Sequence, residues 1–181
     1  MHERTANVGI TQISAPAGLP FIDIEREFDA SPELLFRAYA DPELVVQWLG
    51  PRGYEMIIDR WEPRDGGSWR YVHRDGSGAE YAFHGVFHGP QTVDGMLQTF
   101  EFEGAPGHVA LDGLVFEARG DRTVIRTHSV YQSVADRDAM IEAGMSGGVD
   151  DGFNRLDELI GRLDRGPVAA GSPTDAAVGT R

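Results

Sequence analysis

The 181-residue sequence contains no cysteine and no lysine. The absence of cysteine excludes disulfide bonds, thiolate catalysis and cysteine-ligated zinc or iron–sulfur sites. All 16 basic residues are arginine, and the 29 Asp and Glu residues outnumber them, which leaves a formal net charge of −13. A surface this acidic repels phosphate backbones and anionic lipids, so neither nucleic acid nor a membrane is an expected partner.

Long apolar runs are also lacking. No stretch is long enough to cross a bilayer, and the first residues lead into polar sequence rather than into the apolar segment of a signal peptide. We therefore expect a cytoplasmic protein. The hydrophobic fraction of 41% is typical of a globular chain, and the length fits one domain. Small and polar residues at both ends predict flexible tails over residues 1–18 and 164–181, around one domain over residues 19–163.

Strand patterns dominate the middle of the chain. Residues 21–28 alternate apolar and charged side chains, which predicts a half-buried strand. Six further segments are rich in aromatic or β-branched residues and are separated by turn sequences. They span residues 54–62, 68–73, 79–88, 95–103, 108–118 and 122–131. The short connections between them predict an antiparallel meander, so we expect one strongly curved seven-stranded sheet.

Helix signals flank these strands. Residues 31–33 (SPE) and 41–43 (DPE) combine an N-cap, a proline and an acid, which predicts two short helices. Ser133 and Asp136 resemble a capping box at the start of a long amphipathic helix, and the glycines in 144–148 predict a bend or break in it. One helix cannot fill the concave side of so wide a sheet. The sequence therefore predicts an α+β domain with a cavity between sheet and helix.

Five strings carry a resemblance to known proteins. They are FDASPELLFRAYADPELVVQWLGP (28–51), PRDGGSWRYV (63–72), FHGVF (83–87), HSVYQSVADRDAM (128–140) and GMSGGVDDGFNRLDEL (144–159). In this order they resemble the START/birch-pollen-allergen-like (SRPBCC, helix-grip) superfamily, and within it the branch of activators of the heat-shock-protein ATPase (AHSA-like). The resemblance implies a helix-grip fold, with a curved seven-stranded antiparallel sheet around a long C-terminal helix and two short helices after the first strand.

The resemblance also implies three alternative functions. Superfamily members bind lipids, hormones or polyketide-like aromatic compounds, so the leading expectation is binding of a small hydrophobic molecule in the cavity. The second is a polyketide-cyclase-type enzyme that uses cavity His, Tyr or Arg side chains. The third is a chaperone-ATPase-activator-like interaction protein. Related proteins are often dimers, so a homodimer is an alternative to a monomer.

Aromatic and methionine side chains on the predicted inner faces are the candidate ligand contacts, with plain core packing as the alternative for most of them. They are Trp48, Trp69, Tyr71, Phe83, Phe87, Phe100, Phe116, Met140, Met145 and Phe153. For Trp48, we favour a structural role in which it attaches the second short helix to the sheet.

Polar candidates are fewer. Arg26 falls on the apolar face of its strand, where it needs an ion pair or an anionic ligand group, and we favour the ion pair. His128 is the first candidate for a cavity acid or base, acting with Tyr131 or Asp112. Histidines four residues apart on a strand are about 13 Å apart, too far to share a metal. We expect neither a metal site nor a cofactor.

Overall fold

The computed structural model describes residues 9–165. Their eight strands form one antiparallel sheet in the order β1-β2-β8-β7-β6-β5-β4-β3. The strands are β1 (Gln12–Ser14), β2 (Phe21–Phe28), β3 (Glu55–Trp61), β4 (Ser68–Arg74), β5 (Glu80–Val86), β6 (Met96–Phe102), β7 (Ala110–Arg119) and β8 (Arg122–Val130). The helices are α1 (Pro32–Ala40), α2 (Pro42–Val45), α3 (Val134–Glu142) and α4 (Met145–Asp164).

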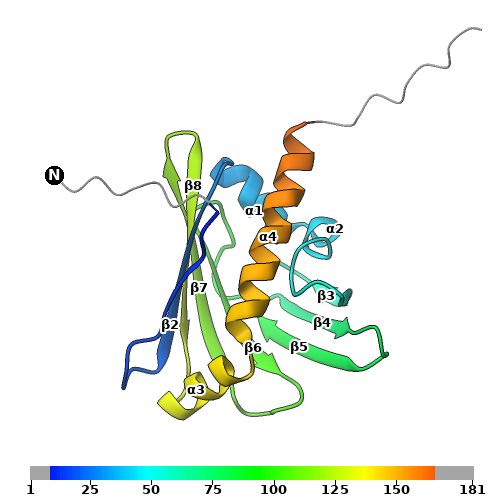
Figure 1. Ribbon diagram of the computed structural model, residues 1–181, viewed down its shortest axis with the longest axis vertical. Coiled ribbons are helices and arrows are strands. Elements are labelled where there is room, and N and C mark those ends of the chain that lie inside the picture. Colours follow the sequence, from blue (N-terminus) through cyan, green and yellow to red (C-terminus); the bar gives the residue numbers. More distant parts are fainter. Residues whose placement is uncertain (1–8, 166–181) are drawn as a thin grey trace, which may run out of the picture.

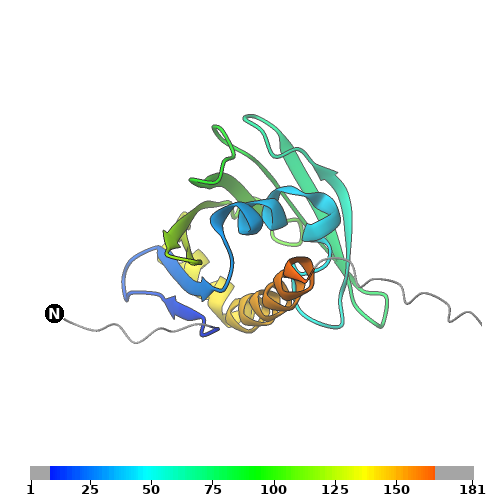
Figure 2. The same cartoon turned by 90° about the horizontal axis from the view of Figure 1, so that it is seen from above.

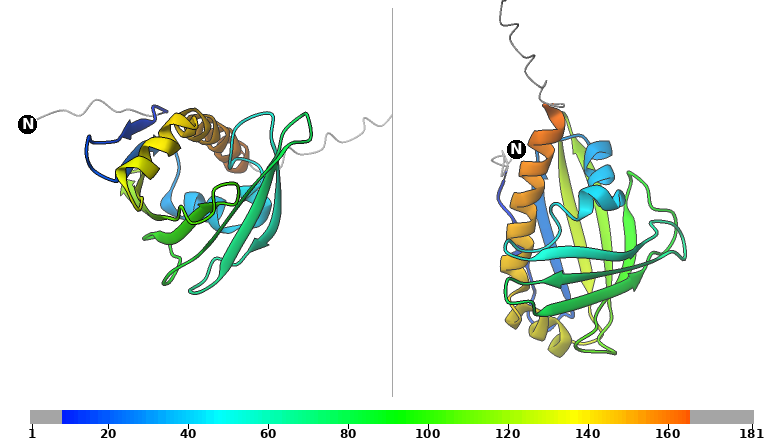
Figure 3. Two further views of the ribbon diagram at one scale, coloured as in Figure 1. Left: turned by 90° about the horizontal axis from the view of Figure 1, so that it is seen from below. Right: turned by 90° about the vertical axis from the view of Figure 1, so that its right-hand side faces the viewer.

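The sheet curves around α4, as Figures 1 and 2 show. Helices α1 and α2 lie at the end of the molecule where α4 finishes, whereas α3 lies at the opposite end, below the first turn of α4 (Figures 1 and 3). The space between sheet and helix therefore has two ends, which we call the α1 end and the α3 end. Strand β2 completes the sheet by pairing with β8 along its whole length, from Phe21 opposite Val130 to Phe28 opposite Thr123.

The architecture confirms the predicted α+β helix-grip fold, with one strand more than expected. The extra strand, β1, lies in the segment assigned to the N-terminal tail, where Ile13 pairs with Ile24 of β2. Three residues are too few to show an alternating pattern, so only pairing with β2 reveals this strand. Residues 1–8 of the predicted N-terminal tail and residues 166–181 of the predicted C-terminal tail lie outside the described residues.

Local signals explain where the helices begin. The Ser31 hydroxyl accepts a hydrogen bond from the Leu34 N–H (3.3 Å), and the Asp41 carboxylate accepts one from the Glu43 N–H (3.0 Å). The buried Trp48 donates its indole N–H to the Ala38 carbonyl oxygen (2.9 Å), which joins the segment after α2 to α1. This contact fits the structural role favoured for Trp48.

The predicted break in the long helix occurs at Gly144, between α3 and α4. Its φ of 85° is left-handed, a conformation that glycine adopts without the steric cost of a Cβ atom. The Ser133 hydroxyl caps α3 by accepting a hydrogen bond from the Asp136 N–H (3.1 Å). None of the helices within residues 9–165 has the length and apolar character needed to cross a membrane.

Candidate functional site

A continuous layer of aromatic rings covers the inner face of strands β4, β5 and β6. Tyr71 stacks against Trp69 with 5.5 Å between ring centroids and lies 5.2 Å from Phe83. Phe83 in turn lies 5.5 Å from Phe100 and 5.2 Å from Phe102. Cross-strand pairing places Tyr71 opposite Phe83, and Phe83 opposite Phe102, which brings these rings to one face. The sequence predicted such a wall, and the structure brings its members together.

Burial of the inward-facing side chains decreases along β6 and toward the first turn of α4, whereas Ile22 and Ala110 near the α3 end stay buried. Phe87, directly after β5, is fully buried, whereas Phe83 within β5 is half-buried. On α4, Leu156 is fully buried whereas Met145 and Val149 are half-buried. Strand β6 repeats the trend, from the buried Met96 to half-buried aromatic residues at its end. The α1 end is therefore a packed core, whereas Phe83, Phe100, Met145 and Val149 toward the α3 end are less completely buried.

Asp112 introduces a carboxyl group into this looser end. It lies opposite the buried Ser129 of β8 and alternates with the inward-facing Ala110 and Leu114 of its own strand. Burial raises the pKa of Asp112 from its ordinary 3.8 to about 6, and a hydrogen bond from Ser129 opposes the shift. The side chain is nevertheless only half-buried by accessible surface.

Two tyrosines share this environment. Tyr71 reaches it from β4, and Tyr131 from the segment after β8. Burial raises the pKa of both hydroxyls, and the nearby Asp112 carboxylate raises them further. Of the predicted polar residues, Asp112 therefore lies near enough to Tyr131 to influence its pKa, and it acts on Tyr71 in the same way.

The third predicted polar residue, His128, is not part of this group. It lies opposite Gly113, one residue out of phase with the inward-facing pair of Asp112 and Ser129. Its side chain is 54% exposed and its Nδ1 lies 2.6 Å from the Asp23 carboxylate on the outer face. This placement is incompatible with the expected role of His128 as a cavity acid or base.

The histidine that faces inward is His73, which sequence reasoning did not single out. It is buried next to Tyr71 (4.9 Å between centroids), and its Nε2 lies 3.3 Å from the Leu49 carbonyl oxygen. Burial lowers its pKa. The signal was available, since His73 continues the alternation of Trp69 and Tyr71 along β4.

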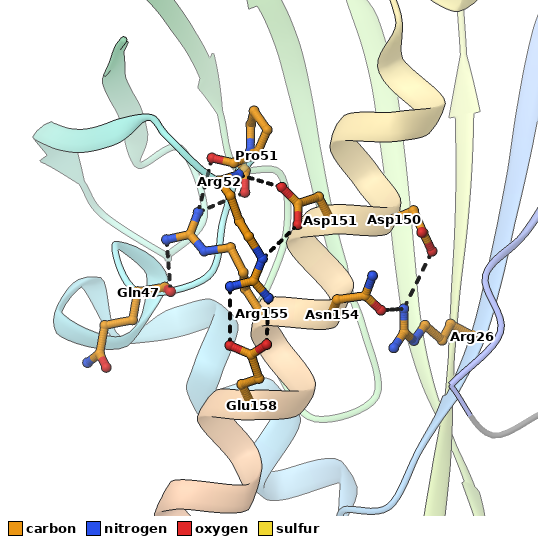
Figure 4. Close-up of polar contacts among 10 residues, drawn as sticks. Arg26, Gln47, Pro51, Arg52, Asp150, Asp151, Asn154, Arg155 and Glu158 are labelled. Atoms are coloured by element: carbon orange, nitrogen blue, oxygen red, sulfur yellow. Dashed lines mark hydrogen bonds and ion pairs between the residues drawn. The ribbon is translucent and has the colours of Figure 1, made fainter. Parts of the chain in front are cut away.

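Arg26 faces inward, as the alternation predicted, and forms a structural ion pair. It is 2% exposed and pairs with Asp157 of α4. Its Nη1 donates to the side-chain amide oxygen (Oδ1) of Asn154 (2.9 Å) and lies 3.6 Å from the Asp150 carboxylate (Figure 4). The guanidinium also lies 5.3 Å from the centre of the Phe28 ring. These contacts satisfy its charge and attach α4 to β2.

A second set of polar contacts holds the other side of α4, as Figure 4 shows. Arg155 donates hydrogen bonds to the carbonyl oxygens of Gly50 (2.8 Å) and Gln47 (3.0 Å). Arg52 pairs with Asp151 (3.1 Å) and with Glu158 (2.5 Å). Polar contacts therefore hold helix α4 over the sheet on two sides, with β2 on one side and the loop after α2 on the other.

The remaining candidate ligand contacts separate according to burial. Those in the packed core are Trp48, Trp69, Phe87, Phe116 and Phe153. Phe83, Phe100 and Met145 are half-buried against the core, and Tyr71 is buried at the edge of the looser end. Met140 of α3 is half-buried but does not belong to the core cluster.

A groove of about 780 Å³ lies on the outer face of the sheet. Exposed apolar residues of β6 and β7, Leu97 and Val115, line it, and Pro90 of the β5–β6 connection borders it. Its charged rim consists of Asp23 and Glu25 on β2 and Arg126 and His128 on β8. These charges already pair across the two strands, His128 with Asp23 and Arg126 with Glu25.

The architecture, a curved antiparallel sheet around a C-terminal helix, is the helix-grip fold of the SRPBCC superfamily. Within that class, residues 29–161 match the family described as "Activator of Hsp90 ATPase homolog 1-like protein". The chain belongs to this family. No curated protein matches it.

Solved structures share the fold at low sequence identity. A Rhodobacter sphaeroides protein is 24% identical, with a TM-score of 0.77, over 84% of this chain and 99% of that one. Protein Ms6760 from Mycobacterium smegmatis is 19% identical, with a TM-score of 0.76, over 83% and 96% of the two chains. The AHSA1 protein from Silicibacter pomeroyi is 21% identical, with a TM-score of 0.64, over 80% and 99%.

Proposed function

We propose that this protein binds a small, mainly apolar molecule of aromatic or polyketide-like type between the sheet and α4, at the α3 end. The observation that carries the proposal is the loss of burial toward this end on β5, β6 and α4. A fully packed interior would bury all the inward-facing residues of these elements equally.

The chemistry of the lining supports an aromatic ligand. The rings of Tyr71, Phe83 and Phe100 offer flat apolar surfaces at spacings that suit offset or edge contacts with a further ring. Across from them, Met145 and Val149 of α4 provide flexible and branched apolar side chains. Ligand sites are commonly of this kind, apolar with few polar groups.

Native mass spectrometry of the purified full chain tests whether a small molecule co-purifies with the protein. A direct binding test uses the neutral dye N-phenyl-1-naphthylamine, whose fluorescence rises in apolar surroundings. We expect saturable binding by the wild type. Val149→Trp should fill the space and weaken binding by about ten-fold or more, because the added ring occupies volume that the dye needs.

Leu111→Trp is the matched control, since Leu111 is 41% exposed on the outer face of β7. It should change dye affinity by less than about two-fold. Circular dichroism checks that both variants fold, and Met145→Trp serves as a second filling variant. Equal binding by wild type, Val149→Trp and Met145→Trp would contradict the proposal.

An enzyme of the polyketide-cyclase type is a second candidate, favoured by the grouping of Asp112, Tyr71 and Tyr131. Cyclisation needs a proton acceptor and hydrogen-bond donors beside a folded apolar substrate, and these three side chains supply both. Turnover of a linear poly-β-ketone by the wild type, abolished in Asp112→Asn, would support this activity. Binding without turnover would reject it.

The family description suggests a third candidate, activation of a chaperone ATPase. The outer groove favours it, because a protein partner needs apolar surface outside the ligand space, and Val115 is 45% exposed there. We would measure the ATPase rate of a bacterial Hsp90 with and without this chain. A rate increase that is lost in Val115→Asp and kept in Val149→Trp would support the candidate, and an unchanged rate would reject it.

A further inference from the structure

Gly113 of β7 lines the outer groove. A glycine inside a strand weakens it, and the usual reasons for one are a left-handed φ or a neighbour that leaves no room for a Cβ atom. The φ of Gly113 is not left-handed. An added Cβ atom would lie 3.8 Å from Leu97 Cδ1 and 3.9 Å from the His128 carbonyl oxygen, which is ordinary contact. The fold therefore gives no reason for a glycine at this position.

Gly85 of β5 shows what such a reason looks like. A Cβ atom there would lie 2.6 Å from the Trp69 ring, so packing inside the chain requires the glycine. Gly113 instead leaves an empty place on the outer face. Leu97 of β6 and His128 of β8 lie opposite it on the two neighbouring strands. We call this place the Gly113 socket, and a glycine of this kind is typical of a site that another group approaches closely.

Exposed apolar side chains surround the Gly113 socket. Leu97 and Val115 line the groove, and each is more than a third exposed. Leu111 and Val130, which lie opposite each other in the next row of the sheet, are exposed to a similar degree. An exposed apolar patch with a charged rim is typical of a surface that contacts another protein. The socket at its centre suits one bulky apolar anchor side chain.

The charged rim of the groove favours a basic partner. Its two carboxylates, Asp23 and Glu25, outnumber its one arginine, Arg126. Arg126 is counterbalanced twice, by Glu25 and by Glu117 (2.8 Å). The net charge of −13 over the whole chain disfavours a second copy as the occupant and attracts a cationic segment.

Strand pairing limits the form that the partner can take. Strand β7 pairs with β6 on one side and with β8 on the other, so the backbone below the groove already bonds within the sheet. An extended segment lying across it would find no backbone partner for its own N–H and C=O groups. A helix satisfies these groups internally and presents apolar residues on one face. The groove therefore suits an amphipathic helix better than an added strand.

We propose that the Gly113 socket is a docking site for a basic amphipathic helix of a partner protein. One bulky apolar side chain of this helix lies over Gly113, and its Lys or Arg side chains face Asp23 and Glu25. The same groove would serve the chaperone contact of the third candidate function, but the inference requires no ATPase activation. It is also independent of ligand binding between the sheet and α4.

Fluorescence anisotropy with the full chain tests this inference. The probe is a fluorescein-labelled model helix of Ala, Leu and Lys with one Phe at the centre of its apolar face. We expect saturable binding with a Kd of about 10–100 μM. A twin peptide with Ala in place of Phe should bind about five-fold more weakly, because it lacks the anchor.

Two variants of the chain locate the contact. Gly113→Leu should weaken binding by about ten-fold, because the new side chain occupies the socket that the Phe ring needs. Asp23→Asn should weaken it by about two-fold, because one exposed carboxylate of the rim is lost. Leu97→Gln removes an apolar wall of the groove and serves as a second socket variant if circular dichroism shows that Gly113→Leu does not fold. It should weaken binding by about five-fold.

Each variant has a matched control. Gly76, in the turn between β4 and β5, also lacks a left-handed φ and has no atom within 4 Å of an added Cβ, so Gly76→Leu makes the same change away from the groove. Asp59→Asn removes a carboxylate that is 65% exposed on β3. Both controls should keep the affinity within about two-fold of the wild type.

Equal affinity of the wild type and Gly113→Leu, or of the Phe peptide and its Ala twin, would overturn the socket. No binding at up to about 500 μM protein would also overturn it. Binding that is lost in Val149→Trp and kept in Gly113→Leu would place the helix in the sheet–helix space and overturn the inference. Sedimentation that shows self-association lost in Gly113→Leu would make a second copy the occupant, with the same consequence. Loss of dye binding with peptide binding retained would reject only the proposed ligand function.

Discussion

The two ends of the space between sheet and α4 are built from the same residue types and differ in how tightly they pack. At the α1 end, Phe28 and Phe153 meet edge to face at 5.5 Å, and both are buried. At the α3 end, Phe83 and Met145 are half-buried, and Asp112 retains accessible surface within a desolvated setting. The first end is a tightly packed core, and the second is less completely buried.

This contrast has a simple geometric origin. Helix α4 lies along the concave side of the curved sheet (Figure 3), and the elements that cover its two ends differ. The short helices α1 and α2 add side chains at the α1 end, including the buried Leu35 and Val45. Helix α3 lies at the other end and buries only Arg137, so it adds little apolar packing there.

The largest expected effect comes from truncating the packed end. Phe153→Ala should lower the free energy of unfolding by about 4 kcal/mol, because it leaves a cavity beside Phe28 in a close-packed region. Met145→Ala at the α3 end should cost only about 1 kcal/mol, since its side chain is half-buried. Urea denaturation measures both. Equal losses at the two positions would contradict the contrast between the ends.

The ion pair between β2 and α4 should have the next largest effect. Asp157→Asn should lower the free energy of unfolding by about 2 kcal/mol, because the 2% exposed Arg26 loses its main anionic partner. Glu158→Gln, which removes a carboxylate paired with the exposed Arg52, should cost less than about 1 kcal/mol. A larger loss for Glu158→Gln than for Asp157→Asn would show that the loop contact, rather than Arg26, holds the helix.

Replacing Asp112, unlike the substitutions above, should raise the free energy of unfolding. Its pKa is raised in the folded state to about 6, from the ordinary 3.8 of an unfolded chain. The folded state therefore binds this proton more tightly, and stability falls as the pH rises from about 4 to 6. Asp112→Asn should be more stable than the wild type above that range, by about 2 kcal/mol after allowance for the part of the carboxyl that water reaches.

The matching control for Asp112 is Asp75, in the turn between β4 and β5. Hydrogen bonds from Ser77 and from the Ala79 N–H lower the pKa of its carboxyl. Asp75→Asn should therefore be less stable than the wild type at neutral pH, and this difference should disappear as the pH falls below the carboxyl's range. Thermal unfolding from about pH 2 to about pH 8 measures both variants. The same sign of effect at the two positions would refute the assignment of Asp112 to a desolvated interior.

The smallest effects should arise where α3 meets α4. Gly144→Ala should cost about 1 kcal/mol, because a φ of 85° is unfavourable once a Cβ atom is present. Gly147→Ala, in the first turns of α4 with no atom within 4 Å of the added Cβ, should stabilise the protein by about 0.5–1 kcal/mol. Stabilisation by both substitutions would mean that the helix does not break at Gly144.

Sequence patterns predicted most of the fold because strands and helices are encoded locally. The alternation in residues 21–28 gave the strand and the inward direction of Arg26. The glycines in residues 144–148 predicted the position of the break between α3 and α4. Strand β1 was not predicted, because its position depends on pairing with β2 rather than on a pattern within its own three residues.

The site was harder to predict, and β8 shows why. Thr123, Val124 and Ile125 are all buried, so this part of the strand gives no alternation from which to assign faces. His128 was chosen as the cavity candidate because it lies on the last strand beside the resemblance motif, and only the pairing of Asp112 with Ser129 shows which residues of β8 face inward. The partner of Arg26 lies 131 residues away in the sequence, a separation at which no local pattern can reveal a contact.

The double attachment of α4 has a consequence for how this protein is made. The residues that hold the helix in place, Arg26 and the loop around Gly50, are synthesised more than 100 residues before their partners Asp157 and Arg155. The sheet can pair while the chain is still growing, but its inner aromatic face stays uncovered until the last helix leaves the ribosome. Nascent chains stalled before residue 150 should therefore depend on holding chaperones, and released chains should not.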